Sequence, residues 1–170
     1  MTEVIVIVAV AQNNIIGKGN DIPWRIREDF LHFKKHTIGH PCVMSDVCYE
    51  SLPEKSRPLP NRENIVLTFN KEYQPAGTTI FNDFNAAIDY CKQNNEEKVF
   101  ITGGSSIYKL GLEIADTFLL TRLHRDIEGE VSFPTVDWSQ WQEVSSERHT
   151  GLDSISNTEI EFSFIEYKRI

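Results

Sequence analysis

Three short apolar runs constrain the fold more than any other feature of this sequence. They occupy residues 4–11, 65–69 and 99–101, and runs of that length and composition indicate strands that are buried on both faces of a sheet. Helical patterns alternate with these runs, near residues 26–36, 84–94 and 106–115. Strands that alternate with helices are joined by right-handed crossovers and pair in parallel. We therefore expect an α/β fold with a mostly parallel central sheet flanked by helices.

The C-terminal segment has a different pattern. Residues 158–169 alternate between polar and apolar side chains, and residues 141–149 precede them across a turn-rich connection at 150–157. A period of two indicates strands with one exposed face, so we expect a C-terminal antiparallel hairpin on the sheet. The segment 51–64 holds three prolines and is expected to be a surface loop. With no linker in sight, residues 1–170 are expected to form a single domain.

Charge and cysteine content exclude several classes of function. The chain has 17 Lys and Arg against 25 Asp and Glu, a net charge of -8, and no basic run, so we expect no nucleic-acid and no membrane-surface partner. The run at 4–11 is about half as long as a membrane-spanning helix and lacks the flanks of a signal peptide. Cys42, Cys48 and Cys91 have no metal-ligand spacing, which favours reduced thiols in the cytoplasm and no metal site. Nothing requires more than a monomer.

One carboxylate shares the apolar side of the first predicted helix. On a helical wheel Asp29 falls on the same face as Ile26, Phe30 and Phe33. Such an acid is either a surface residue at the edge of the face or a buried group that needs a partner. In the second case burial raises its pKa, and a cationic or donor-rich ligand is the natural partner. Periodicity alone does not choose between them.

Two further segments have the composition of binding loops. In KVFITGGSSIYKLG, at residues 98–111, an apolar strand runs into two glycines and a helix start, where free N–H groups suit a phosphate. The alternative is a simple tight turn. Residues 11–24 join the first strand to the first helix through a polar, glycine-containing loop. That loop is either an ordinary surface connection or a lid over a ligand at the carboxyl end of the sheet.

Six motifs occur in order along nearly the whole chain. They are AVAQNNIIGKGNDIPW from residue 9, EDFLHFKKHT from 28, RPLPNREN from 57, TGGSSIY from 102, LTRLH from 120 and IEGEVSFP from 127. In this order and spacing they resemble dihydrofolate reductase. The resemblance implies that family's fold, the reduction of 7,8-dihydrofolate to 5,6,7,8-tetrahydrofolate by hydride from a nicotinamide cofactor, NADPH in the family, and the binding of antifolate-type small molecules.

The resemblance also implies roles for substrate-site residues. Asp29 would be the acidic residue of the pterin pocket, which binds the 2-amino group and N3 and helps N5 to acquire a proton. Thr121 is expected to orient Asp29 through a hydrogen bond, and Trp24 to hold an ordered water. Phe33 is expected to stack on the substrate, and Arg62 to pair with the α-carboxylate of its glutamate tail. Further substrate contacts are expected from Ile7, Val8, Lys34, Arg57, Leu59 and Thr102.

The cofactor is expected along the glycine pair. Gly103 and Gly104 match a Gly-Gly of the family that is joined by a cis peptide bond, and the resemblance places the pyrophosphate on them and on Ser105 and Ser106. Tyr108 is expected near the nicotinamide and in the catalytic set. Further cofactor contacts are expected from Ala9, Ile16, Asn20, Ser45, Asp46, Cys48, Thr68 and Phe69.

One segment departs from the family pattern. Asp46 stands where the family has an arginine for the 2'-phosphate of NADPH, and Cys48 replaces a threonine near the pyrophosphate. An acid repels a phosphate but accepts a hydrogen bond from a free ribose hydroxyl. One hypothesis is therefore a weakened preference for NADPH, with NADH also used. In the alternative, Asp46 turns outward and a nearby Lys or Arg covers the phosphate.

Two other functions remain open from the sequence. The same fold could reduce another pterin or a pyrimidine of riboflavin synthesis, although Asp29, Phe33 and Arg62 together favour a folate. The chain could also be a folate-binding protein that has lost turnover, because the cofactor site departs from the family pattern.

Overall fold

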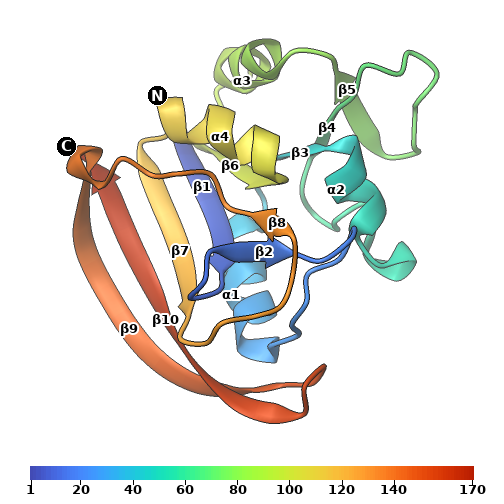
Figure 1. Ribbon diagram of the computed structural model, residues 1–170. Coiled ribbons are helices and arrows are strands. Elements are labelled where there is room, and N and C mark those ends of the chain that lie inside the picture. The colour runs from blue at the N-terminus through green and yellow to red at the C-terminus, as the bar shows by residue number, and fades with distance from the viewer.

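The computed structural model describes residues 1–170 and contains one large sheet. Its eight strands lie in the order β5-β4-β3-β6-β1-β7-β10-β9, and only the pairings made by β10 are antiparallel. The strands are β1 (Glu3–Val10), β3 (Cys42–Ser45), β4 (Asn64–Leu67), β5 (Thr78–Phe81), β6 (Lys98–Gly103), β7 (Thr117–Leu123), β9 (Trp141–Asp153) and β10 (Thr158–Arg169). Figure 1 shows the long curved pair β9 and β10 at one edge and β5 at the other.

Helices cover both faces of this sheet. They are α1 (Arg27–Thr37), α2 (Asp46–Ser51), α3 (Phe84–Gln93) and α4 (Ser105–Ile114), with single 3-10 turns at Glu54–Ser56 and Trp138–Gln140. Successive side chains of a strand point to opposite faces. Val6 of β1 therefore packs with Ile88 and Leu112 of α3 and α4, whereas Ile7 faces the cluster that includes Phe33 of α1.

The predicted fold class is confirmed. The apolar runs at 4–11, 65–69 and 99–101 correspond to β1, β4 and β6, and the three predicted helices correspond to α1, α3 and α4. The hairpin prediction needs one correction, because β9 continues to Asp153 and leaves a turn of only Ser154–Asn157. Asp153 is buried, and its carboxylate accepts hydrogen bonds from the Arg25 and Ile155 amides and the Ser156 hydroxyl.

The strands that the sequence pattern did not reveal are short or contain polar residues. They include β3, β5 and β7 of the large sheet, and a separate pair formed by β2 (Ile15–Gly17) and β8 (Val131–Ser132). The predicted loop at 51–64 is shorter in the structure, because Ser51 ends α2 and Asn64 begins β4. Asn64 fixes the loop by exchanging hydrogen bonds with the Leu59 backbone. No helix is both long and apolar enough to cross a membrane.

A cluster of histidines joins α1 to the hairpin. The His32 ring stacks on Phe164 of β10, with centroids 3.9 Å apart and planes 7° apart, and the His36 ring lies 4.5 Å from His32. The ring of His149, on β9, lies 5.0 Å from Phe164. Burial, assisted by the charges of His36, Lys35 and His149, lowers the pKa of His32 from 6.5 to about 4.

We expect acid to weaken this interface. Because the pKa of His32 is lower in the folded chain, its contribution to stability is present above pH 6.5 and is lost as the pH falls toward 4. After allowance for solvent screening, the loss between pH 7 and 5 is about 1 kcal/mol. The His32→Phe variant keeps a flat ring against Phe164 and should show a smaller change. Urea unfolding at several pH values measures this, and equal pH dependence in both proteins would contradict it.

Candidate active site

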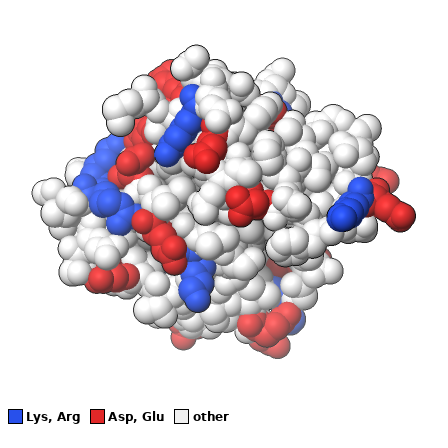
Figure 2. All heavy atoms as spheres, turned by 90° about the horizontal axis from the view of Figure 1, so that it is seen from above, with Lys and Arg blue, Asp and Glu red and all other residues white.

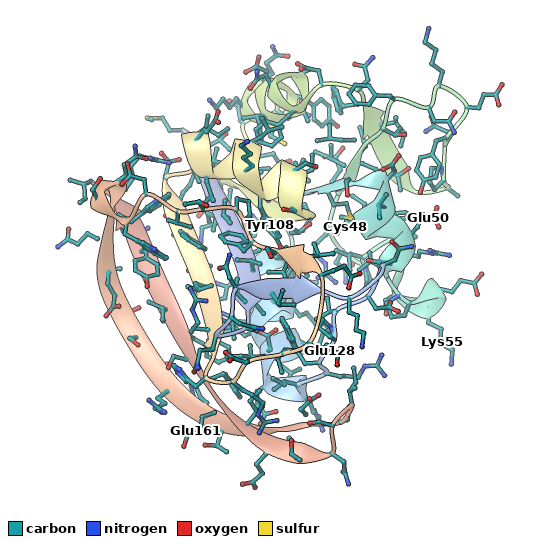
Figure 3. The ribbon with its side chains drawn as sticks, viewed as in Figure 1. Cys48, Glu50, Lys55, Tyr108, Glu128 and Glu161 are labelled. Atoms are coloured by element: carbon teal, nitrogen blue, oxygen red, sulfur yellow. The ribbon has the colours of Figure 1, made fainter.

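Several of the predicted site residues lie at the carboxyl ends of the central parallel strands, whereas Arg62 precedes β4 and Lys34 lies in the last turn of α1. This edge is where open α/β sheets bind ligands. It is bordered by Asp29 in the first turn of α1, by the Gly103–Gly104 turn after β6 and by Ser45 at the end of β3. In Figure 3, Tyr108 and Cys48 lie in this region, between α4 and α2.

Asp29 is a desolvated acid. Burial raises the pKa of its carboxyl from 3.8 to about 6, and a hydrogen bond with the Thr121 hydroxyl lowers that pKa only in part. The side chain keeps some exposed surface, and it has no ion-pair partner among the Lys, Arg and His residues. Of the two interpretations left by periodicity, the buried acid without a partner is the one that the structure supports.

Tyr108 lies between two of the predicted substrate-binding carbonyls. Its hydroxyl oxygen is 3.0 Å from the Ile7 carbonyl oxygen and 2.9 Å from that of Thr102. Burial, followed by the charges of Cys48 and Asp29, raises the pKa of Tyr108 well above 10. The phenol therefore stays protonated, and its single proton is shared between two acceptors that point toward the same space.

The apolar residues of α1 are not equally buried. Ile26 and the neighbouring Trp24 are buried in one cluster, and Phe33 packs half-buried against another. Phe30, placed on the same face by the helical wheel, keeps 53% of its surface exposed. The sequence did not identify Phe30 as a site residue, and its exposed ring follows Asp29 directly in the chain.

Burial limits how Val8 and Leu59, two more predicted substrate-site residues, can contact a ligand. The Val8 side chain belongs to the core on the α3 and α4 face, so that only its backbone is available on the side of Asp29. Leu59 is buried among the residues around Ile7 and Phe33. It thus lines the apolar wall rather than an open surface.

The two predicted tail-binding arginines differ in their engagement. Arg57 is paired with Glu50 at 2.9 Å and also donates to the Glu50 carbonyl oxygen. Arg62 donates to the Thr37 hydroxyl at 3.0 Å and to the Pro60 carbonyl oxygen at 2.9 Å, and it has no carboxylate partner. Arg62 therefore retains a free charge for a ligand anion, as does the exposed Lys34, which forms no ion pair.

The glycine pair gives a ligand close access to the backbone. The peptide bond between Gly103 and Gly104 is cis, as the resemblance implied, and Gly103 has a φ of 125°. A Cβ on Gly103 would lie 3.3 Å from both the Cys48 sulfur and the Tyr108 ring. No side chain caps the start of α4 at Ser105. Its free N–H groups suit an anion such as a pyrophosphate.

Neighbouring hydroxyl and thiol groups complete this part of the site. Ser45 accepts hydrogen bonds from the Cys48 amide and, at 3.4 Å, from the Gly104 amide. The Cys48 thiol points inward to the Thr102 carbonyl oxygen at 3.7 Å, and burial raises its pKa to about 12. The exposed Ser106 and the half-buried Ser105 are the first two residues of α4.

Asp46 does not pair with a cation. One carboxylate oxygen accepts the Thr68 hydroxyl at 2.8 Å, and the other accepts the Val47 amide at 2.8 Å. These bonds hold the Asp46 carboxylate beside Thr68. Whether a nearby Lys or Arg covers the phosphate stays an open alternative. Phe69, beside Thr68, is 89% exposed and offers an uncovered ring at this edge.

The loop at 11–24 is tied to the segment after β7. The Asn13 side chain exchanges two hydrogen bonds with the Ile127 backbone, and the Lys18 ammonium pairs with Glu128 at 3.5 Å. The pairing of β2 with β8, visible in Figure 1, adds a short ladder. Within the loop, Ile16 is half-buried and Asn20 is exposed, while Ala9 lies just before it on β1.

On the face shown in Figure 2, acidic and basic side chains are interleaved with uncharged surface between them, and the net charge is -8.

Comparisons with known proteins agree on one family. The family model described as Dihydrofolate reductase matches residues 3–169. Dihydrofolate reductases of Bacillus subtilis and Staphylococcus haemolyticus are each 37% identical to the chain, over 95% and 96% of it and over 93% and 94% of their own lengths. A solved structure described as dihydrofolate reductase from Enterococcus faecalis complexed with NADP(H) and RAB-propyl superposes with a TM-score of 0.86 at 30% identity, covering 98% of this chain and 96% of that one. The chain therefore belongs to the dihydrofolate reductase family.

Proposed function

We propose that this protein reduces 7,8-dihydrofolate to 5,6,7,8-tetrahydrofolate with hydride from a nicotinamide cofactor. The observation that carries the proposal is the Asp29 carboxyl, whose pKa is raised to about 6 by burial and which has no cationic partner. A carboxylate in such a place accepts two hydrogen bonds from a flat, amidine-like donor pair, as the pterin ring presents. It also titrates near neutral pH, where a group that delivers a proton works best.

The surrounding residues would orient the substrate. The Ile7 and Thr102 carbonyl oxygens both lie within hydrogen-bond distance of the Tyr108 hydroxyl and so point to one region. In the complex they would offer acceptors to the far edge of the pterin ring. Phe33 supplies an apolar face on α1. Thr121 would orient the Asp29 carboxylate through its hydroxyl, and the buried Trp24 would hold an ordered water near the pterin.

The residues present fit a nicotinamide cofactor. A side chain at Gly103 would crowd Cys48 and Tyr108. The uncapped start of α4, with Ser45, Ser105 and Ser106 beside it, suits a pyrophosphate. When bound, the cofactor supplies the hydride, whereas the chain supplies alignment and a dry pocket. The ties between the loop at 11–24 and the segment after β7 support a lid that excludes water.

The proposal is tested by steady-state oxidation of NADPH with dihydrofolate as the acceptor. Turnover supports it. Quenching of tryptophan fluorescence by a folate analogue without turnover would instead indicate a binding protein of the same fold. Faster turnover of a pterin or pyrimidine that lacks the glutamate tail would indicate a reductase of that compound. We further propose a monomer in the cytoplasm that binds antifolate-type molecules, and size-exclusion chromatography tests the monomer.

Arg62 is expected to determine substrate affinity. In the Arg62→Leu variant we expect the KM for dihydrofolate to rise about tenfold to a hundredfold with little change in kcat, because a charge-assisted contact to the substrate tail is lost. Arg57→Leu is the matched control. Its guanidinium already pairs with Glu50, so its effect should be smaller than about threefold. Equal effects of the two substitutions, measured by initial rates, would contradict this assignment.

A further inference from the structure

A second cavity lies on the opposite face of the sheet from Asp29. Phe118, Leu120 and Arg122 of β7 line it, together with Phe133 and Trp138 from the segment that follows β8. Thr121, which contacts Asp29, alternates with these residues along the strand and therefore points to the other face. Figure 1 shows the segment after β8 crossing this side of the sheet toward the C-terminus. The cavity is thus separated from the proposed substrate cleft by the sheet itself.

Arg122 brings an uncompensated positive charge to this cavity. The side chain is half-buried, and one nitrogen donates to the Ala11 carbonyl oxygen at 3.0 Å. No Asp or Glu lies within ion-pair distance of it. Burial lowers its pKa from 12.5, with Tyr167 as the one interacting acidic group. A guanidinium with unused N–H groups suits a bidentate carboxylate.

Trp138 is the aromatic wall that an occupant can reach, because Phe118 and Phe133 are only 0% and 4% exposed. The Phe118 and Trp138 rings are nearly parallel, with centroids 5.9 Å apart and planes 10° apart, and Phe133 lies 5.7 Å from Phe118. Trp138 is 43% exposed at the mouth. The volume of about 230 Å³ lies below the range of about 300–1,000 Å³ that drug-sized ligands occupy. One aromatic ring or a fused pair fits, whereas a folate or a dinucleotide does not.

The cavity also contacts the lid. Asn14, which lines it, donates from its side chain to the Phe133 carbonyl oxygen at 2.7 Å, and its own carbonyl oxygen accepts the Phe133 amide at 2.9 Å. Arg122 holds the Ala11 carbonyl at the beginning of the same loop. An occupant that contacts Arg122 and Phe133 therefore acts on two of the residues that hold this loop.

We propose that this cavity is a second ligand site, selective for small planar aromatic monocarboxylates, with Arg122 binding the carboxylate and the exposed Trp138 packing against the ring. Occupation stabilises the tied arrangement of the loop at 11–24. Its effect on turnover rests on the proposed function, whereas the binding itself does not. The expected kinetic signature is a lower kcat that added dihydrofolate does not reverse.

The test is calorimetric titration with 1-naphthoate, and with 1-naphthamide as its neutral counterpart, after the substrate cleft has been saturated with a diaminopteridine antifolate. We expect the carboxylate to bind at least about tenfold more tightly than the amide, because only the carboxylate forms charge-assisted hydrogen bonds. In the Arg122→Gln variant this difference should disappear. In Trp138→Ala, which changes an exposed residue, both ligands should bind more weakly.

Two controls separate this site from others. Arg148→Gln removes an exposed charge from β9 at a residue that does not line the cavity, and should leave binding unchanged. Arg62→Leu should also leave it unchanged. Loss of binding on antifolate saturation or in Arg62→Leu would place the ligand in the substrate cleft and overturn the proposal, as would equal binding of acid and amide by the parent protein. If Arg122→Gln does not fold, the comparison of 1-naphthoate with 1-naphthamide and the binding to Trp138→Ala still test the proposal.

Discussion

Replacement of Asp29 by asparagine is expected to lower kcat/KM for dihydrofolate by about a hundredfold to ten-thousandfold, the range typical for loss of a proton-transfer group. The amide keeps the size of the side chain and a contact with Thr121 but offers one acceptor instead of two and cannot relay a proton. Initial rates with NADPH measure the effect. A variant that retains more than about a tenth of the parent activity would show that Asp29 is not the proton-delivering residue.

The same substitution should change the pH dependence. The pKa of Asp29 is raised to about 6, so the protonated form gains population as the pH falls through 6. We expect the rate of hydride transfer in the parent to increase over that interval and the rate in Asp29→Asn to stay constant. Single-turnover measurements between pH 5 and 8 give both profiles, and parallel profiles would exclude Asp29 as the titrating group.

The Asp29→Asn substitution should raise stability although it lowers activity. A carboxyl with a raised pKa binds its proton more tightly in the folded chain. The stability it confers is therefore full below pH 3.8 and is lost as the pH rises to about 6. At pH 8 we therefore expect Asp29→Asn to unfold at a higher temperature than the parent. A gain in thermal stability with a loss of turnover is the signature of a residue retained for function. An equal loss of both would indicate a structural role.

The sequence predicted those parts of the fold whose pattern is local. The runs that became β1, β4 and β6 are continuous apolar segments, and β10 alternates with period two. By contrast, β3 and β5 are four residues long, and β2 and β8 are shorter still. Such strands are defined by the partners that hydrogen-bond to them, and no window of the sequence contains those partners.

The functional site likewise combines features that the local sequence marks with features that depend on the tertiary structure. Asp29 is marked locally, because a carboxylate interrupts an apolar helix face. Its ionisation state depends on residues distant in the sequence. Burial in the folded chain raises the pKa of Asp29, and the Thr121 hydroxyl, which lowers that pKa in part, belongs to β7. Arg122 gave no signal in the sequence at all. Its importance depends on the cavity and on the absence of a carboxylate nearby, and both are tertiary features.

The register of β3 and β4 explains where Asp46 lies in the structure. The sequence reveals only that the charge is reversed relative to the family. Because β3 and β4 pair in parallel with Ser45 opposite Leu67, the next residues along both strands, Asp46 and Thr68, become neighbours and form a hydrogen bond of 2.8 Å. The carboxylate is thereby held at the edge of the sheet beside the exposed Phe69, with no cation to neutralise it.

Cofactor preference should therefore depend on Asp46. We expect the parent protein to use NADH with an efficiency closer to that of NADPH than an arginine at this position would allow. In Asp46→Arg, the ratio of kcat/KM for NADPH to that for NADH should rise about tenfold to a hundredfold, because a repulsive charge is replaced by a charge-assisted contact to the 2'-phosphate. Initial rates with both cofactors at fixed dihydrofolate give the ratio.

Asp89→Arg supplies the matched control for this substitution. Asp89 is exposed on α3, so the exchange changes the net charge by the same amount without touching the end of β3. Its ratio should remain that of the parent, and the effect of Asp46→Arg should decrease with added salt as expected for an exposed ion pair. A strong NADPH preference in the parent, unchanged in Asp46→Arg, would mean that the phosphate is bound elsewhere. An equal rise of the NADPH to NADH ratio in Asp46→Arg and Asp89→Arg would mean that the effect comes from net charge alone.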